Sequence, residues 1–304
     1  MLIRGALKKL KYFSRVFVNY SRMEPNTMNT MNTMNTMNPM NTNNEDAALV
    51  AVPVAPLPTT LKTEDTGKIF EKAICDAYGI PFDGPFQYSQ ADVDKLTPRL
   101  KRIVTDNLFP MCVHTASKGA RYDFTSVADS GVHLSAKSNK KKGGKVAPQV
   151  VGQATPQKFW EEVCMCSSSV VIAAEPTIAA DPATLKKYIQ ENITTIMPML
   201  WRYTFDSPIV YYVRDTDEIR FIAPAAVAGG GEQPDWSAFQ YTWSRPYDKW
   251  TNSTSLRIIA PGGVKEETIM EFQFHTKSRQ NMAVRWAIDK VLQVFAGHFK
   301  VDVL

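Results

Sequence analysis

The spacing of apolar residues predicts that the folded part of the chain begins near Leu61. Apolar side chains at helical spacing favour one amphipathic helix that ends at Gly79, and a second over Asp92–Leu108 that is ended by Pro110. From Arg121 the period of the pattern changes to two, which is typical of β-strands. Helices therefore come first, and a hairpin follows them.

The second half of the folded part alternates between the two periods. One predicted helix begins at Thr155, a second lies near Thr184–Ile196, and a third spans Asn281–Phe295. The predicted strands are a short one over Pro148–Gln153 and longer ones at Ile209–Val213, Ile219–Ile222, Leu256–Ala260 and Thr268–His275. Helices and strands mixed in this order predict an α/β or α+β domain.

The first sixty residues have a different composition. Residues 1–22 carry six Lys and Arg residues and no acidic one, and Met28–Asn44 repeat the triplet Met-Asn-Thr without any charged or aromatic side chain. Such a segment cannot build a core, so residues 1–60 are expected to be a disordered tail and linker, and residues 61–304 one domain. The basic start is compatible with a transit peptide, a membrane-surface helix, or a true start at Met23.

Composition narrows the class of protein. The chain of 304 residues is 44% hydrophobic and 11% aromatic, which is enough for a buried core. No apolar run reaches the roughly 18 residues of a membrane span, so no membrane segment is expected. The four cysteines have no disulfide or zinc spacing, which favours reduced thiols and a cytoplasmic protein. Outside residues 1–22 the charge is nearly balanced, so nucleic-acid binding would depend on local basic clusters.

The hairpin at residues 121–139 carries the first candidate chemistry. A tight turn with Ser130 at its tip would place Asp123 opposite Lys137, with both side chains on the polar face. A register shifted by one residue would bury Asp123 in the core, which is costly for a charged group. A carboxylate beside a lysine suits phosphodiester hydrolysis with Mg²⁺. The structural alternative is an exposed cross-strand ion pair.

The pattern of residues around this hairpin resembles a known family. Asp123, eleven intervening residues, Ser135 and then Lys137 two positions later form a D-x11-S-x-K motif, with helices bearing glutamates before and after it. This arrangement, over about residues 66–165, resembles the PD-(D/E)xK nucleases, and specifically their type II restriction endonucleases. The resemblance implies a mixed central β-sheet flanked by helices, with Asp123 as Mg²⁺ ligand and Lys137 assisting the attack of water.

The sequence departs from that family pattern at two positions. Tyr122 stands where a proline is usual, and Ser135 stands where the second acidic residue is usual. Serine cannot supply a carboxylate, so another residue would have to complete the metal site. The candidates are Glu71 on the first helix and Glu161, with its neighbour Glu162, on the helix after the lysine-rich loop. The sequence leaves this choice open.

Candidate DNA-binding residues lie in two segments. One follows the hairpin and contains a run of lysines and two glutamines, and the other lies within a DNA-reading region at about residues 236–285, where a predicted strand-to-helix junction would also favour a phosphate. Ordinary polar surface loops are the alternative for both. The residues are Lys140, Lys141, Lys142, Gln149 and Gln153 in the first segment, and His275, Lys277, Arg279, Asn281 and Arg285 in the second.

These features together favour a sequence-specific double-stranded DNA endonuclease that requires Mg²⁺. A homodimer is expected because a palindromic site has two-fold symmetry, and restriction implies a cognate DNA methyltransferase. One alternative is a non-catalytic nucleic-acid-binding protein on a degenerate nuclease fold. Another is a virion or organellar scaffold that uses the basic N-terminus.

Overall fold

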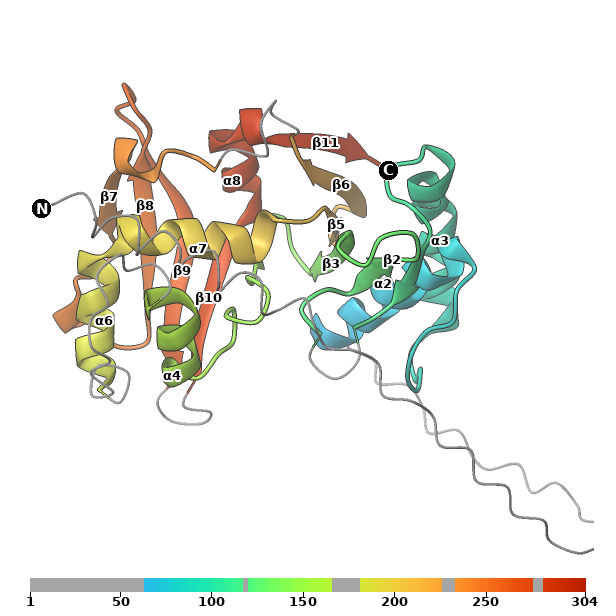
Figure 1. Cartoon of the computed structure of the whole chain (residues 1–304), viewed down its shortest axis with the longest axis horizontal. Helices are drawn as coiled ribbons and strands as arrows, with labels where there is room; N and C mark the ends of the chain where they lie inside the picture. The colour runs from blue at the N-terminus through green and yellow to red at the C-terminus, as the bar shows by residue number, and fades with distance from the viewer. Residues whose placement is uncertain (1–62, 117–119, 166–180, 226–232, 276–280) are drawn as a thin grey trace, which may run out of the picture. The chain divides into compact units, whose positions relative to one another are not determined.

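The computed structural model describes residues 63–116, 120–165, 181–225, 233–275 and 281–304 (Figure 1). By its internal contacts the chain separates into Met1–Val54 and Ala55–Leu304, and every described residue belongs to the second unit. The expected tail at residues 1–60 therefore lies outside the described residues.

Six strands of the described ranges form one mixed sheet. The parallel pairing of its third and fourth strands in spatial order joins two antiparallel halves, so the sheet is mixed. In spatial order its strands are β1 (Cys112–His114), β2 (Phe124–Ser126), β3 (His133–Asn139), β5 (Ile209–Val213), β6 (Glu218–Pro224) and β11 (Phe299–Val303).

Two helices cover one face of this sheet. They are α2 (Thr63–Tyr78) and α3 (Gln90–Thr105), whose buried side chains share one core with those of β2 and β3. Figure 1 shows α2 beside β2, with α3 next to α2. α3 begins after Ser89, whose hydroxyl accepts a hydrogen bond from the Asp92 backbone N–H. α2 ends before Gly79, which has a φ of +66°, a backbone conformation that glycine adopts without strain. Both predicted helices are confirmed.

A second core covers the other face and includes a second, antiparallel sheet. It contains three tryptophans in mutual contact, Trp201, Trp236 and Trp286, together with Ile209 and Tyr211 from β5. The second sheet runs, in spatial order, β4 (Lys145–Val146), β10 (Asn281–Ala287), β9 (Glu266–His275), β8 (Ser253–Ile259) and β7 (Gln240–Trp243).

Helices of the second half complete this core. Figure 1 shows α4, α6 and α7 beside the strands of the second sheet. The α-helices are α4 (Pro156–Phe159), α6 (Pro182–Glu191), α7 (Ile193–Phe205) and α8 (Ile288–Val294), with a π-helix η2 (Trp160–Met165) and 3₁₀ turns η3 (Trp236–Ala238), η4 (Tyr247–Lys249) and η5 (Ala296–His298).

The predicted terminal helix over Asn281–Phe295 is wrong in its first half. Residues Asn281–Ala287 form strand β10, which pairs with β9 so that Met282 faces Phe274 and Trp286 faces Met270. The helix α8 occupies only the second half of the predicted range. A short apolar run fits both periods, and the pairing with β9 decides between them.

Two other boundaries differ from the prediction. The predicted helix near Thr184–Ile196 is two helices, α6 and α7, and the second continues past Pro198 to Phe205. The predicted strand at Pro148–Gln153 is not a strand, although Gly152 and Ala154 accept backbone hydrogen bonds from β10. The α/β class, with a mixed sheet flanked by helices, is confirmed at that level. Among the described residues no helix is long and apolar enough to cross a membrane.

A hydrogen bond in the second core gives a test of this packing. Trp286 Nε1 donates to Thr204 Oγ1 at 2.8 Å, and both side chains are buried. Thr204→Val keeps the shape but leaves the indole N–H unpaired, so the free energy of unfolding should fall by about 1–3 kcal/mol in urea denaturation. The exposed Thr251→Val is the control, and an equal effect of both substitutions would contradict the packing described here.

Candidate active site

The hairpin of β2 and β3 forms with a register that differs from the predicted one. Phe124 lies opposite Leu134 and Thr125 opposite His133, which brings Asp123 level with Ser135 instead of Lys137. The loop is longer than the expected three residues, since the ladder ends at Thr125 and His133 and Val132 donates to the Asp129 carbonyl. A slip of two residues leaves every side chain on the same face, so Asp123 and Lys137 still project to one side.

Asp123 and Lys137 lie next to each other at the start of this hairpin. Asp123 Oδ2 accepts a hydrogen bond from the Ala136 backbone N–H at 2.7 Å and lies 3.6 Å from Lys137 Nζ. The two side chains are 17% and 21% exposed, respectively. The ion pair is thus half-enclosed rather than fully solvated, unlike the exposed cross-strand pair that was the structural alternative.

Glu71, on α2, reaches the same site. Its carboxylate lies 2.8 Å from Lys68 Nζ and 3.5 Å from His114 Nε2, and its side chain is 13% exposed. Burial raises the pKa of Glu71, but the neighbouring His114 and Lys68 nitrogens outweigh burial and hold that pKa below its ordinary value. Glu71 is therefore kept as a carboxylate.

The two carboxylates influence each other. Burial raises the pKa of Asp123, the charge of Glu71 raises it further, and the nearby Lys137 opposes both without cancelling them. The charge of Asp123, like that of Glu71, raises the pKa of Lys68. Two acidic and two basic side chains thus form one electrostatic cluster, and a bound cation would relieve the repulsion between the carboxylates.

His114 is part of this cluster, although sequence reasoning left it unassigned. Its side chain is 2% exposed and stacks on Phe82, with ring centroids 4.8 Å apart. Its Nδ1 accepts a hydrogen bond from the Asp83 backbone N–H, so the neutral ring carries its proton on Nε2, the atom that faces Glu71. No residue spacing in the sequence predicts the contact of His114 with Glu71, because β1 and α2 meet only in the folded chain.

Gln149 also lies at this site rather than away from it. Its carboxamide lies 2.7 Å from Ser135 Oγ and 2.8 Å from Lys137 Nζ. Ser135 itself is 1% exposed, so its hydroxyl faces Gln149 and not solvent. The contact of Gln149 with DNA that the sequence suggests stays a prediction.

The other candidate glutamates point to different partners. Glu161, on η2, is exposed and accepts a hydrogen bond from Gln157 at 2.6 Å. Glu162 accepts one from the Tyr203 hydroxyl at 2.5 Å. Of the three candidates, Glu71 is the one with a described electrostatic link to Asp123.

The lysine-rich loop and the glutamine that follows it are accessible. Lys140, Lys141 and Lys142 are exposed directly after β3, and Gln153 is exposed beside β10, to which its neighbours Gly152 and Ala154 are hydrogen-bonded. The loop is anchored because the Lys142 backbone N–H donates to Asp215.

The predicted strand-to-helix junction in the reading region is wrong. β9 and β10 are paired antiparallel strands, so no helix begins at Asn281 to favour a phosphate. His275 is exposed at the end of β9, and Arg285, on β10, lies opposite Glu271, which also pairs with Lys145 at 2.7 Å. Lys277 and Arg279 lie outside the described residues.

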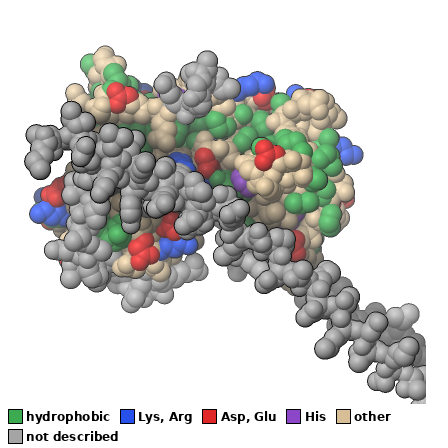
Figure 2. Space-filling model, in the orientation of Figure 1, with side chains coloured by type: hydrophobic (Ala, Val, Ile, Leu, Met, Phe, Trp, Pro, Cys, Tyr) green, Lys and Arg blue, Asp and Glu red, His purple; other side chains and the backbone are tan. Residues whose placement is uncertain are grey.

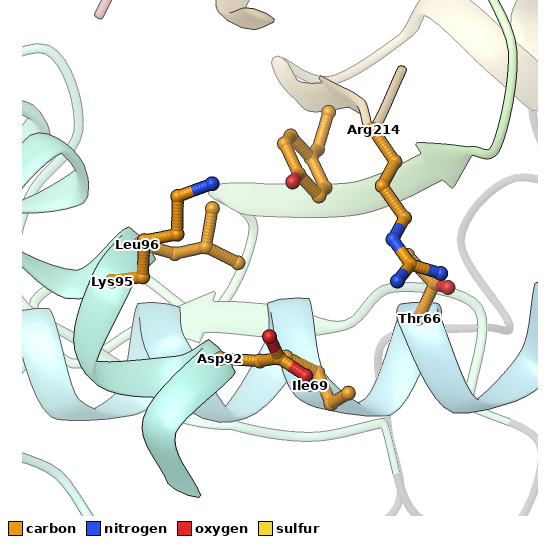
Figure 3. Close-up of a pocket in the computed structure, with 7 residues that line it drawn as sticks. Thr66, Ile69, Asp92, Lys95, Leu96 and Arg214 are labelled. Carbon is orange, nitrogen blue, oxygen red and sulfur yellow. The ribbon is translucent and has the colours of Figure 1, made fainter. Parts of the chain in front are cut away.

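The surface charge and one described pocket can be compared with the positions of Glu71, Asp123 and Lys137. On the face in Figure 2 the visible basic and acidic side chains are interspersed, in agreement with the nearly balanced charge of the folded part. A pocket between α2, α3 and the end of β5 is lined by charged and apolar side chains, and its residues come from other positions than Glu71, Asp123 and Lys137 (Figure 3). These residues are Thr66, Ile69, Asp92, Lys95, Leu96, Tyr212 and Arg214.

Comparison with known proteins gives one similarity. The chain resembles a type II restriction enzyme. It is 35% identical over 244 residues to the type II restriction enzyme CviAII of Paramecium bursaria Chlorella virus 1. The matched region covers 80% of this chain and 64% of that relative. No protein-family model matches the sequence, and no solved structure matches it.

The donor set at the site fits a hard divalent cation. Asp123 and Glu71 offer carboxylate oxygens, and Mg²⁺ commonly takes one or two carboxylates together with water and substrate phosphate. Within the described ranges no group of three or more His, Cys, Asp or Glu side chains is placed to hold a metal.

The raised pKa of Asp123 predicts a gain in stability on neutralising this residue. The folded state favours the protonated acid, so the wild type loses stability as the pH rises above the ordinary aspartate value of 3.8. Without metal, Asp123→Asn should be more stable than the wild type near neutral pH, because the amide carries no charge for burial to destabilise. The difference should vanish towards about pH 4.

Urea unfolding in EDTA at several pH values measures this effect. The exposed Asp94→Asn, on α3, serves as the control. A loss of stability in Asp123→Asn at neutral pH would show that the ion pair with Lys137 outweighs burial.

Proposed function

We propose that the chain is a Mg²⁺-dependent, sequence-specific double-stranded DNA endonuclease of the type II restriction class, on a PD-(D/E)xK site. The observation that carries the proposal is the half-buried cluster of Asp123, Glu71 and Lys137 around the β2–β3 hairpin. The similarity to a type II restriction enzyme supports the same reaction.

In this proposal Asp123 and Glu71 are the residues that hold Mg²⁺. The bound ion would supply Lewis-acid chemistry, since it neutralises phosphate charge and lowers the pKa of water. His114 and Lys68 keep Glu71 ionised and directed, because both groups point hydrogen-bond donors at its carboxylate. Ser135 takes no metal, because its hydroxyl is buried against Gln149.

Lys137 provides the positive charge at the reacting phosphate. Its ammonium lies beside Asp123, so it would orient the attacking water or stabilise the charge that develops on the phosphate. Water then displaces the 3′ oxygen in line, and the products carry a 5′-phosphate and a 3′-hydroxyl, as the family resemblance implies.

DNA would be held by groups outside this cluster. The exposed Lys140, Lys141 and Lys142 continue directly from the strand of Lys137 and suit phosphate contacts. Gln153 and the β9–β10 strands, with Asn281 and Arg285, offer amide and guanidinium groups of the kind that read base edges. A palindromic site would require a homodimer, and protection of host DNA would require a methyltransferase.

Substitution of Lys137 tests the proposal. With Mg²⁺ the wild type should cut unmethylated plasmid DNA into discrete fragments, and EDTA should abolish cutting. Lys137→Ala should lower the cleavage rate by about 10²–10³-fold while DNA binding in a gel-shift assay persists, because its ammonium stabilises the transition state. Lys300→Ala, an exposed strand lysine near Asp302, is the matched control.

The outcome also separates the two classes of function. A wild-type protein that binds DNA and never cuts it, at any Mg²⁺ concentration, would support the non-catalytic binding protein instead. The serine at position 135 is the feature that keeps this second candidate open.

A comparison of two glutamates tests the metal site. Glu71→Gln should raise the Mg²⁺ concentration for half-maximal cleavage by about 10–100-fold, the range found when metal-site groups are replaced. Glu161→Gln should leave it near the wild-type value, since Glu161 is exposed and bonded to Gln157. The reverse order of effects would assign the second metal ligand to η2.

A further inference from the structure

We propose that Gln149 is a positioning residue. It holds the Lys137 ammonium and so takes over this role from the second acidic side chain, which is missing. The inference rests on the proposed function and deepens it. Gln149 lies on the segment after β4, and its partner Ser135 stands where the second acidic residue of the resembled family is usual. The acceptor for Lys137 thus comes from a different part of the chain.

The hydrogen-bond partners of Gln149 select one orientation of its carboxamide. With Oε1 facing β3, the oxygen accepts from Ser135 Oγ at 2.7 Å and from Lys137 Nζ at 2.8 Å, while Nε2 donates to the Arg121 carbonyl at 3.0 Å. The opposite orientation sets an amide N–H against the ammonium and an oxygen against a carbonyl oxygen. Gln149 therefore presents an acceptor to the ammonium.

The backbone around Gln149 holds this acceptor in place. Its own N–H donates to the Tyr203 carbonyl on α7 at 2.8 Å, and Gly152 closes the turn by donating to the Pro148 carbonyl. A Cβ at Gly152 would lie 2.4 Å from that carbonyl oxygen, so the turn requires glycine. Val150 has a φ of +61°, a rare conformation for a β-branched residue, and the surrounding contacts must maintain it.

A neutral acceptor suits the charge of the site. Asp123 and Glu71 already repel each other, so a third carboxylate would add to that repulsion. The Gln149 oxygen directs the Lys137 ammonium without adding negative charge. Ser135 completes the arrangement because its buried hydroxyl donates to the same oxygen.

Two substitutions distinguish the effect of the Gln149 acceptor oxygen from the effect of the size of its side chain. Gln149→Leu removes the acceptor at similar size, and Gln149→Glu keeps an acceptor oxygen. We expect Gln149→Leu to lower kcat by about 10²-fold with KM for DNA within about threefold, since a misplaced catalytic group has effects of that order. Gln149→Glu should stay within about tenfold of the wild type. Gln293→Ala, an exposed glutamine on α8, should leave kcat unchanged.

A second readout does not depend on cleavage. The rate at which an amine-reactive reagent modifies Lys137, followed by peptide mass spectrometry, should rise about threefold or more in Gln149→Leu, as expected for loss of one net hydrogen bond. It should not rise in Gln149→Glu, because a carboxylate beside the ammonium favours its charged, unreactive form, and it should stay at the wild-type value in Gln293→Ala.

The outcomes distinguish the two proposals. Unchanged Lys137 reactivity in Gln149→Leu, equal loss of kcat in Gln149→Leu and Gln149→Glu, or a rise in KM alone would overturn the positioning role. A wild type that never cleaves DNA would overturn the proposed endonuclease, while the labelling result would still decide whether Gln149 holds Lys137.

Discussion

The parallel pairing of β3 with β5 is the contact on which the rest of the structure depends. It places β3 in the interior of the mixed sheet, where Leu134 and Ala136 face α2 and α3 and the alternate side chains face the second core. Ser135 is fixed at this point by its backbone hydrogen bond to the Pro208 carbonyl. Lys137, two residues further, is therefore presented on the same side as Ser135, at a defined height along the strand.

This placement has an electrostatic consequence. A half-buried lysine needs a partner, and Asp123 supplies it from the neighbouring strand while Glu71 approaches from the helix that packs on β3. In this cluster the charged form of Asp123 is destabilised, and the pKa of Asp123 is raised accordingly. Groups that are unfavourable in the free protein and would become favourable with a cation and a phosphate are typical of functional sites.

The departure at Ser135 is explained by the same geometry. The side chain at this position is 1% exposed, and burying a hydroxyl that is hydrogen-bonded to Gln149 costs less free energy than burying an unpaired carboxylate. The segment that carries Gln149 continues along β10, so the candidate active site and the strands proposed to read DNA are joined by a short, hydrogen-bonded stretch. The proposed chemistry and the proposed recognition are thereby linked through the backbone.

The sequence by itself determined the features that depend on local periodicity. The first helices, the hairpin, and the side of the hairpin on which Asp123 and Lys137 lie all follow from it, because a strand's alternation survives a slip of two residues. The exact pairing, the strand at Asn281–Ala287, and the positions of Glu71, His114 and Gln149 were decided by tertiary structure. Each of these depends on contacts between segments far apart in the chain, which no local pattern records.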